Sequence, residues 1–384
     1  MGPLEGVRIV EIAGIGPGQL CGMLLADMGA QVVRVDRLAA AEAGVALPSR
    51  FDLMNRSRPA LAVDLKRPEG VELVLELCTS ADALFEGFRP GVMERLGLGP
   101  EACMARNPKL VYGRMTGWGQ DGPLAGRAGH DPNYIALAGV LSCIGERGGP
   151  PVYPLNLVAD FGGGGVYLAL GLLAGIIEAS RSGRGQVVDA AMVDGAASLT
   201  TLFHGLLAAG LWKEERGSNI LDGGAPFLRP YETSDGRHVV IGALEPRFFR
   251  VLLERMGIDD IDPAGQDDPR QWPAMQRRFE EAFRTRSRQE WCQLLQDTDA
   301  CFTPVLSLTE ATRHPHALAR GTYVAVDGVT QPAPAPRFSR TPSAISQPPR
   351  PAGVGARAAL GAWGMTSARI EALARAGVIK LADG

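Results

Sequence analysis

The first 115 residues alternate short apolar runs with segments in which apolar positions have a helical spacing. Residues 7–12 (Val-Arg-Ile-Val-Glu-Ile) are rich in β-forming side chains, and a turn of Gly and Pro separates them from a helical pattern over about 17–29. A second apolar run, 31–36, follows directly. A strand, a helix and a strand in this order form a unit whose two strands run parallel. The pattern therefore predicts a parallel sheet.

The same alternation continues along the chain. Further strands are expected over 60–64, 83–85 and 110–115, and Pro68 is well placed as the first residue of a helix that ends near 78. Residues 116–133 are rich in Gly and polar side chains and predict a loop. Beyond this loop, the apolar pattern predicts helices over 134–143, 162–180 and 190–210.

The pattern changes after about residue 213. Two β-rich runs, 226–233 and 238–242, flank Ser234-Asp235-Gly236 and predict a hairpin. Helical patterns follow over 246–256, 272–284 and 287–296. Residues 331–352 contain seven prolines, which predicts an extended linker, and helical spacing returns over 355–376.

These patterns together predict an α/β fold, with a Rossmann-like parallel-sheet large domain and a smaller α+β domain. We assign 1–212 to the first part of the large domain and 213–325 to the small domain. Residues 326–384 are expected to form the proline-rich linker and C-terminal helices that return to the large domain. The length of 384 residues agrees with two domains.

Composition excludes several classes of partner. With 46% hydrophobic and 21% charged residues, the chain is typical of a soluble globular protein, and its net charge of -3 provides no basic field for nucleic acid or a membrane surface. The apolar run 165–177 is thirteen residues long, too short to span a bilayer, and is expected to be a buried helix. The N-terminus has no basic signal-like region, and the six cysteines form no C-x-x-C pair. We therefore expect a cytoplasmic protein without a metal site.

Candidate chemistry is concentrated in two short segments. One of only five histidines, His130, lies in the loop Gly129-His-Asp-Pro-Asn-Tyr134, and Asp160 precedes four glycines at a predicted helix start. An imidazole and a carboxylate can add and remove a proton on opposite faces of a carbon. N–H groups around 160–163 could hold the negative charge that forms in between. Taken singly, His130 could instead be structural, Asp160 a helix N-cap, and Glu245 only an acid before a helix.

Two further patterns suggest ligand binding. Gly14-Ile-Gly-Pro-Gly18 lies between the first strand and helix, but its spacing departs from a dinucleotide motif, so a tight turn is the preferred interpretation. Basic residues at strand ends would share one edge of a parallel sheet and suggest a ligand with several phosphates, or else a solvated basic face. These residues are Arg37, Arg56, Arg58, Lys66, Arg67, Arg89 and Arg95.

Several longer motifs carry a resemblance to a known family. They include Leu4-Glu-Gly-Val-Arg-Ile-Val-Glu11, Val63-Asp-Leu-Lys66, Gly117-Trp-Gly-Gln-Asp-Gly-Pro123, Gly223-Gly-Ala-Pro226 and the segments around His130 and Asp160. In these motifs the chain resembles the α-methylacyl-coenzyme A racemases, a branch of the family III coenzyme A transferases, over essentially its whole length. One departure is Leu228, which stands where these racemases usually have tyrosine.

The resemblance implies roles for individual residues. His130 and Asp160 would be the acid/base pair that inverts the α-carbon of a 2-methylacyl-coenzyme A, and Glu245 would orient His130. Coenzyme A, as part of the substrate, would be held by Arg37, Val63, Asp64, Leu65, Lys66, Gly87, Phe88, Arg89, Arg95, Gly129, Asp131, Asn133 and Tyr134. Members of this superfamily are interlocked homodimers, and the chemistry needs no separate cofactor. The alternative is a transferase in which Asp160 is a nucleophile.

Overall fold

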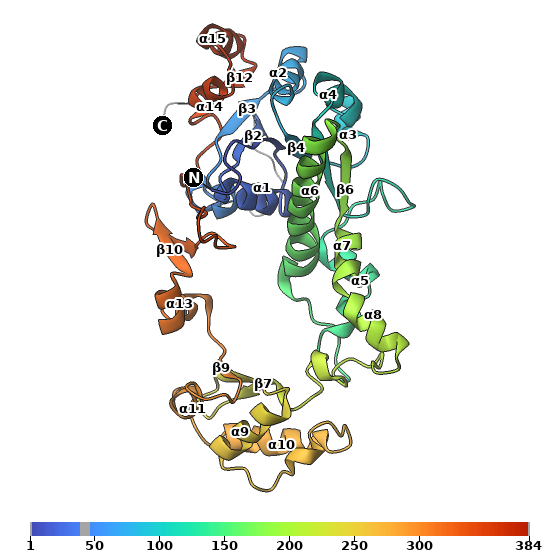
Figure 1. Cartoon of the computed structure of the whole chain (residues 1–384), viewed down its shortest axis with the longest axis vertical. Helices are drawn as coiled ribbons and strands as arrows, with labels where there is room; N and C mark the ends of the chain where they lie inside the picture. Colours follow the sequence, from blue (N-terminus) through green and yellow to red (C-terminus); the bar gives the residue numbers. More distant parts are fainter. Residues whose placement is uncertain (1, 39–46, 383–384) are drawn as a thin grey trace. The chain divides into compact units, whose positions relative to one another are not determined.

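The computed structural model describes residues 2–38 and 47–382. Contacts divide the chain into two compact units (Figure 1). The first unit comprises Met1–Ala138, Leu155–Thr200 and Ala319–Gly384, and the second comprises Gly139–Pro154 and Thr201–Leu318. This division groups 139–154 and 201–212 with the second unit, whereas we had assigned both to the large domain.

A seven-stranded sheet forms the centre of the first unit in the described part of the chain. Its strand order is β12-β3-β2-β1-β4-β5-β6, and all neighbours are parallel except β12, which is antiparallel to β3. The order 3-2-1-4-5-6 is that of a doubly wound α/β sheet, so the predicted parallel sheet is confirmed. The strands are β1 (Arg8–Ile12), β2 (Gln31–Arg37), β3 (Ala60–Val63), β4 (Ala83–Glu86), β5 (Val111–Thr116), β6 (Val187–Ala191) and β12 (Ile379–Lys380).

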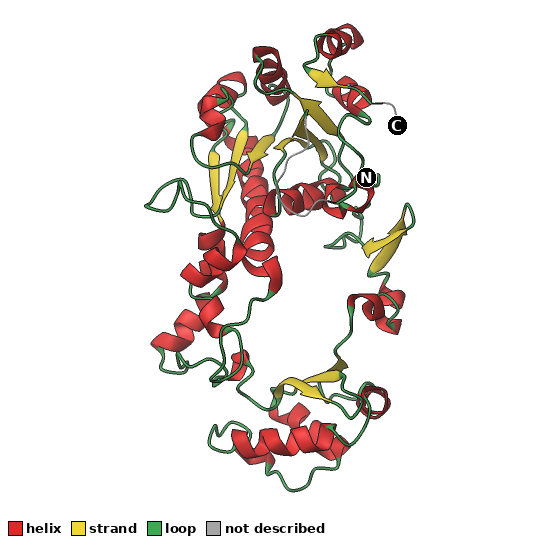
Figure 2. Ribbon diagram, turned by 180° about the vertical axis from the view of Figure 1, so that it is seen from behind, coloured by secondary structure: helices red, strands yellow, loops and turns green. Residues whose placement is uncertain are grey.

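Helices cover both faces of this sheet, and Figure 2 shows the strands bordered by them. Val10 and its neighbours on one face belong to a buried cluster with side chains of α2 (Pro68–Cys78), α4 (Pro100–Arg106), α14 (Ala356–Ala362) and α15 (Ser367–Arg375). On the other face, a Cβ at Gly113 of β5 would lie 2.9 Å from Leu168 and Leu172 of α6 (Val166–Ser182). α1 (Pro17–Asp27) contacts α6 and lies on this side. Burial on both faces explains why the strands are apolar at consecutive positions.

The glycine-rich segment begins its helix earlier than expected. A 3₁₀ turn, η4 (Leu155–Leu157), leads into a π-helical segment, η5 (Val158–Gly165), which continues as α6. A Cβ at Gly163 would lie 2.6 Å from the backbone N of Ala196 in α7 (Met192–Leu199), and one at Gly165 would lie 2.6 Å from the carbonyl oxygen of Pro17. These glycines are therefore required by close packing of η5 against α7 and α1.

The apolar helix α6 is buried on one side only. Leu168 and Leu172 are fully buried, but Val166, Leu170 and Ile177 are 46%, 62% and 53% exposed. Our expectation of a buried helix therefore holds for one face. By length and composition alone, the continuous stretch Leu155–Ser182 could cross a membrane, although a helix packed in a protein core can have the same properties. The contacts of α6 with β5 and β6 identify it as a sheet-packing helix.

Two of the arginines proposed to bind phosphates are structural. Arg58 is 2% exposed and forms an ion pair with Glu11 inside the sheet domain. Arg56 is 3% exposed; its Nη2 lies 2.6 Å from Asp27, and its Nη1 donates to Gln331 at 2.9 Å. Arg56 thereby anchors the start of the proline-rich segment. This segment follows a small hairpin of β10 (Tyr323–Val326) and β11 (Val329–Pro332). Buried, paired cations of this kind are not available to a ligand.

Shorter elements complete the first unit. They are η1 (Ser49–Phe51), η2 (Leu53–Asn55), α3 (Val92–Arg95) and α5 (Asp131–Leu137). The last of these begins one residue after His130, three residues before the expected helix start, because Pro132 suits the first turn of a helix.

The second unit is built on a three-stranded antiparallel sheet of order β7-β8-β9. β7 (Leu228–Glu232) and β8 (His238–Gly242) form the predicted hairpin, and β9 (Phe302–Pro304) adds a short strand that the sequence pattern did not reveal. An aromatic core that includes Phe227, Phe249 and Phe279 fixes its helices against this sheet. The elements of this unit also include η3 (Leu141–Cys143), α8 (Thr201–Ala208), η6 (Ile220–Asp222), α9 (Pro246–Met256), η7 (Pro263–Gly265), α10 (Trp272–Phe283), α11 (Arg288–Leu295) and α12 (Leu308–Ala311), and α13 (Pro315–Arg320) spans the boundary of the two units.

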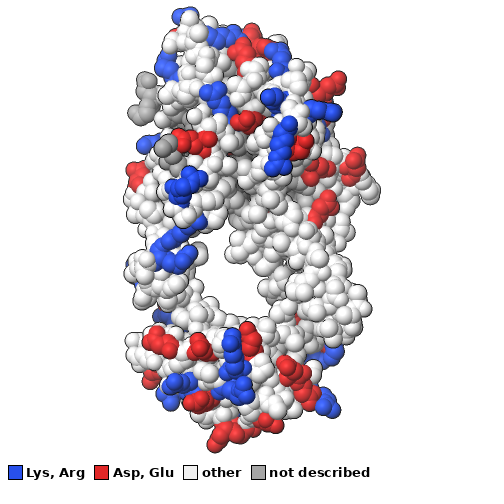
Figure 3. All heavy atoms as spheres, in the orientation of Figure 1, with Lys and Arg blue, Asp and Glu red and all other residues white. Residues whose placement is uncertain are grey.

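Charges of both signs are interspersed over the face shown in Figure 3. This agrees with the net charge of -3 and shows no extended basic field on that face. An anionic ligand must therefore be met by a local group of cations.

Candidate active site

The carboxyl ends of the parallel strands carry most of the expected coenzyme A residues. Arg37 ends β2, Val63 ends β3 and Glu86 ends β4, so the residues that follow these strands share one edge of the sheet. Asp64, Leu65 and Lys66 follow β3, whereas Gly87, Phe88 and Arg89 follow β4. Arg95 ends α3, directly beyond the β4 loop.

Contacts among these residues hold the edge together. The Arg37 guanidinium carbon lies 5.8 Å from the centroid of the Phe88 ring, which joins the ends of β2 and β4. The N–H of Lys66 donates to the Asp64 carboxylate at 3.1 Å and tightens the turn after β3. The N–H of Phe88 donates to Glu86 Oε2 at 2.6 Å. Burial is the main cause that raises the pKa of Glu86 to about 7, against an ordinary value of 4.5.

His130 is the residue that precedes α5, and its side chain is exposed. The N–H of His130 donates to Asn133 Oδ1 at 3.0 Å, and the Tyr134 hydroxyl donates to the carbonyl oxygen of Gly129. The Tyr134 ring contacts Trp118 edge-to-face, with centroids 4.7 Å apart. Asn133 and Tyr134 thus fix the backbone on both sides of His130, whereas the imidazole is left accessible.

Asp160 lies in the first turn of η5 and is half-buried. Its Oδ2 accepts a hydrogen bond from Asn156 Nδ2 at 3.0 Å, and a Cβ at Gly16 would lie 3.3 Å from the same oxygen. Burial is the main cause that raises the pKa of Asp160, and the Asn156 hydrogen bond and the charge of His130 act in the opposite direction. The carboxyl is therefore held near a second proton carrier in surroundings that favour its neutral form.

Asp131 joins the His130 segment to the Asp160 turn. Its Oδ2 accepts hydrogen bonds from the N–H groups of both Ala159 and Asp160, each at 2.8 Å, and the residue is 1% exposed. Its buried Oδ1 has no hydrogen-bond partner among the described residues, and the expected contact of Asp131 with coenzyme A stays a prediction. The N–H of Asp160, which we expected to stabilise an oxyanion, is occupied.

Glu245 belongs to the second unit. It precedes α9, its side chain is exposed, and its carbonyl oxygen accepts the N–H groups of Phe248 and Phe249. His130 and Asp160 belong to the first unit, so the expected partnership of Glu245 with His130 stays a prediction. Within residues 2–38 and 47–382, no group of three His, Cys, Asp or Glu side chains could hold a metal ion.

Sequence reasoning missed three supporting residues. Asn156 and Asp160 are four positions apart, the spacing of neighbours on one helix face, and this spacing could have revealed their hydrogen bond. Glu86 closes the β4 loop, and its place at the end of an apolar strand was the available signal. The approach of Gly16 to Asp160 depends on tertiary packing and left no local signal.

Comparison with known proteins places this geometry in a family. A family model described as CoA-transferase family III matches residues 4–356. Alpha-methylacyl-CoA racemase of Mus musculus is 47% identical over 345 residues, which cover 89% of this chain and 88% of the mouse protein. The racemase of Homo sapiens is 43% identical over 343 residues, or 88% and 87% of the two chains.

The fold of this chain is also similar to that of solved structures. The crystal structure of a CAIB/BAIF family protein from Brucella suis, 24% identical in sequence, covers 94% of this chain and 99% of its own with a TM-score of 0.79. The family model spans far more than half of the sequence, including both candidate acid/base residues. The chain therefore belongs to CoA-transferase family III.

Proposed function

We propose that the protein inverts the α-carbon of 2-methylacyl-coenzyme A thioesters, with His130 and Asp160 as the acid/base pair. The observation that carries the proposal is the link between the two residues. Asp131, which directly follows His130, accepts the backbone N–H of Asp160 at 2.8 Å, and the charge of His130 acts on the pKa of Asp160. The similarity to two alpha-methylacyl-CoA racemases supports this substrate class.

In this mechanism each group serves one face of a planar enolate. With one epimer, neutral His130 removes the α-proton and protonated Asp160 returns a proton to the opposite face. With the other epimer, ionised Asp160 is the base and protonated His130 is the acid. Asp160 must therefore change protonation state during turnover, and its half-buried position raises its pKa towards the working range. These proton transfers require no further cofactor.

The substrate's coenzyme A portion would lie along the carboxyl edge of the sheet. Arg37, Lys66, Arg89 and Arg95 end strands or follow them there, and we propose that they meet the phosphates. Burial raises the pKa of Tyr134 to about 12, and the nearby charge of Arg89 acts in the opposite direction, which connects the β4 loop with the His130 segment.

We further propose that the protein acts as an interlocked homodimer and that Glu245 of one chain orients His130 of the other. Exposed apolar side chains of η4 and α6 support an interface. Leu155 and Leu157 of η4 and Leu170 of α6 are 65%, 53% and 62% exposed. Exposed apolar side chains along one stretch of helix are typical of a surface that another protein covers.

The experiment is to incubate the protein with each single epimer of a 2-methylacyl-coenzyme A in D₂O. Both epimers should form, with deuterium at the α-carbon, and no acceptor acid should be needed. A transferase, the alternative, would use Asp160 as a nucleophile and would require a free carboxylic acid as acceptor. Activity that depends strictly on such an acceptor, without exchange of the α-proton, would contradict the racemase assignment.

A further inference from the structure

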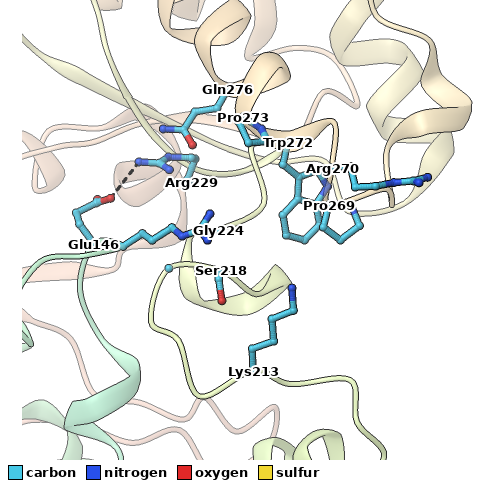
Figure 4. A pocket seen from close by; sticks show the side chains of 12 residues that line it. Glu146, Lys213, Ser218, Gly224, Arg229, Pro269, Arg270, Trp272, Pro273 and Gln276 are labelled. Atoms are coloured by element: carbon cyan, nitrogen blue, oxygen red, sulfur yellow. Dashed lines mark hydrogen bonds and ion pairs between the residues drawn. The ribbon is translucent and has the colours of Figure 1, made fainter.

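The second unit contains a cavity that the proposed reaction does not use. Its volume is about 480 Å³, within the range of small-molecule sites. Three segments of this unit surround it: 146–147, 213–229 and 269–276 (Figure 4).

One wall of the cavity is a loop that is fixed by its own hydrogen bonds. The Asp222 carboxylate accepts the N–H groups of Gly217 at 3.0 Å, Asn219 at 2.8 Å and Gly224 at 3.1 Å. Asn219 in turn accepts the N–H of Lys213 at 2.8 Å and donates to its carbonyl oxygen at 3.0 Å. The charge of Asp222 is satisfied within the loop, and the backbone of Lys213 is held in place before any ligand binds.

The cavity is lined by more cations than carboxylates. Arg147, Lys213, Arg229 and Arg270 contribute positive charge, and Glu146 is the only acidic residue among the described lining residues. Two of the cations already form close pairs with carboxylates outside the lining: Arg147 lies 2.9 Å from Glu215, and Arg270 lies 2.9 Å from Asp268. Lys213 and Arg229 are therefore the lining cations least committed to a carboxylate.

The side chains of Arg229 and Lys213 form only weak interactions with the residues around them. The Arg229 side chain is 15% exposed; Nη1 donates to the Gly223 carbonyl oxygen at 3.2 Å, Nη2 donates to Glu146 at 3.3 Å, and the buried Nε has no partner among the described residues. Glu146 itself is 77% exposed, and such an ion pair contributes little. For Lys213, no described carboxylate lies within 4.0 Å of the ammonium.

The remaining wall is apolar. Pro269, Trp272 and Pro273 line it, and the indole N–H of Trp272 is already bonded to the Gln266 carbonyl oxygen at 2.9 Å. Figure 4 shows Lys213 extending towards Trp272 and Pro269 from the opposite side, whereas Arg270 points away from the other side chains. The cavity thus combines two cations with a surface for an uncharged ligand body.

We propose that this cavity binds a small molecule with more than one phosphate group, in which Arg229 and Lys213 meet separate phosphates. A phosphate oxygen takes the place of the Glu146 carboxylate on Arg229, because a phosphate dianion forms stronger charge-assisted hydrogen bonds with a guanidinium than one exposed carboxylate does. The apolar body of the ligand contacts Trp272 and the two prolines. The site lies wholly within the second unit and does not depend on the proposed racemase reaction.

The test is calorimetric titration of the full-length protein with inorganic pyrophosphate at low ionic strength. Wild type should bind saturably, and Lys213→Ala should weaken binding about tenfold, the loss of one charge-assisted contact. Glu146→Gln should tighten binding about two- to fivefold, because it removes the competing carboxylate from Arg229. Arg270→Ala is the matched control, since it removes a lining cation that is paired and points away, and it should leave the affinity unchanged.

Lys66→Ala controls for the cations of the first unit. The proposal is overturned if wild type shows no saturable binding, or if Arg270→Ala weakens binding as much as Lys213→Ala. It is also overturned if Lys66→Ala abolishes binding while Lys213→Ala does not, because the anion would then occupy the sheet edge. Opposite shifts from Glu146→Gln and Lys213→Ala, with circular dichroism unchanged, would support it.

Discussion

The buried carboxyl of Glu86 makes the stability of the first unit depend on pH. Its pKa is raised to about 7 from an ordinary 4.5, chiefly by burial, whereas the N–H of Phe88 and the charge of Arg114 act in the opposite direction. The folded protein therefore holds a proton on Glu86 between about pH 4.5 and 7 that the unfolded chain releases. Stability should fall as pH rises through this window.

The magnitude follows from the two pKa values. At 1.36 kcal/mol per pKa unit, ionised Glu86 costs the folded state about 3 kcal/mol above pH 7, and most of this cost appears between pH 5 and 8. Glu86→Gln removes the ionisation, and its amide oxygen can still accept the N–H of Phe88. Relative to wild type, the variant should gain about 2 kcal/mol of unfolding free energy between pH 5 and pH 8.

The assay is urea unfolding of both proteins at pH 5, 6, 7 and 8, at one fixed protein concentration. Glu72→Gln is a matched control, because Glu72 is 41% exposed and pairs with Arg106 at the surface. Its difference from wild type should stay within about 0.5 kcal/mol at every pH. A difference between Glu86→Gln and wild type that is constant from pH 5 to 8 would refute the assignment of a proton to Glu86.

Three further predictions concern the proposed active site. Lys66→Ala should raise KM more than it lowers kcat, because the phosphates are remote from the reacting carbon. This effect should shrink as salt is added, because salt screens the charge contact. A salt-independent loss confined to kcat would argue against a phosphate contact. Asn156→Leu removes the hydrogen bond that favours ionised Asp160, so the acid limb of kcat/KM for the epimer that Asp160 deprotonates should move to higher pH, with a loss of about tenfold along that limb. An unchanged pH profile would leave Asn156 with a purely structural role. Co-refolding of His130→Ala with Glu245→Ala should restore part of the activity that each variant lacks, and well-folded but inactive mixtures would contradict a site shared between two chains.

The sequence predicted local structure correctly where a single pattern over a few residues determines that structure. Apolar runs placed β1 to β5 to within one residue at either end, and Pro68 marked the start of α2 correctly, because strand burial and proline geometry act over a few residues. The roles of charged residues were less predictable. Arg56 and Arg58 precede β3, whereas Arg37 ends β2, and the tertiary positions of Asp27 and Glu11 make Arg56 and Arg58 structural. The same holds for Asp131, whose hydrogen-bond donors, the N–H groups of Ala159 and Asp160, lie 28 and 29 positions along the chain.

The side chains of the acid/base pair differ in burial and in hydrogen bonding. Asp160 is half-buried, with Asn156 on its carboxylate and Asp131 on its backbone, whereas the His130 imidazole is exposed although its backbone is fixed. Charge that develops on an enolate is stabilised best where water is excluded and fixed dipoles replace it. An exposed imidazole does not meet that condition, so we infer that a further surface must cover His130 when substrate is bound. A carboxylate on that surface would hold the imidazole in one tautomer and favour its protonated form. This requirement is independent of family resemblance, whereas the choice of Glu245 of a second chain as that carboxylate rests on the resemblance.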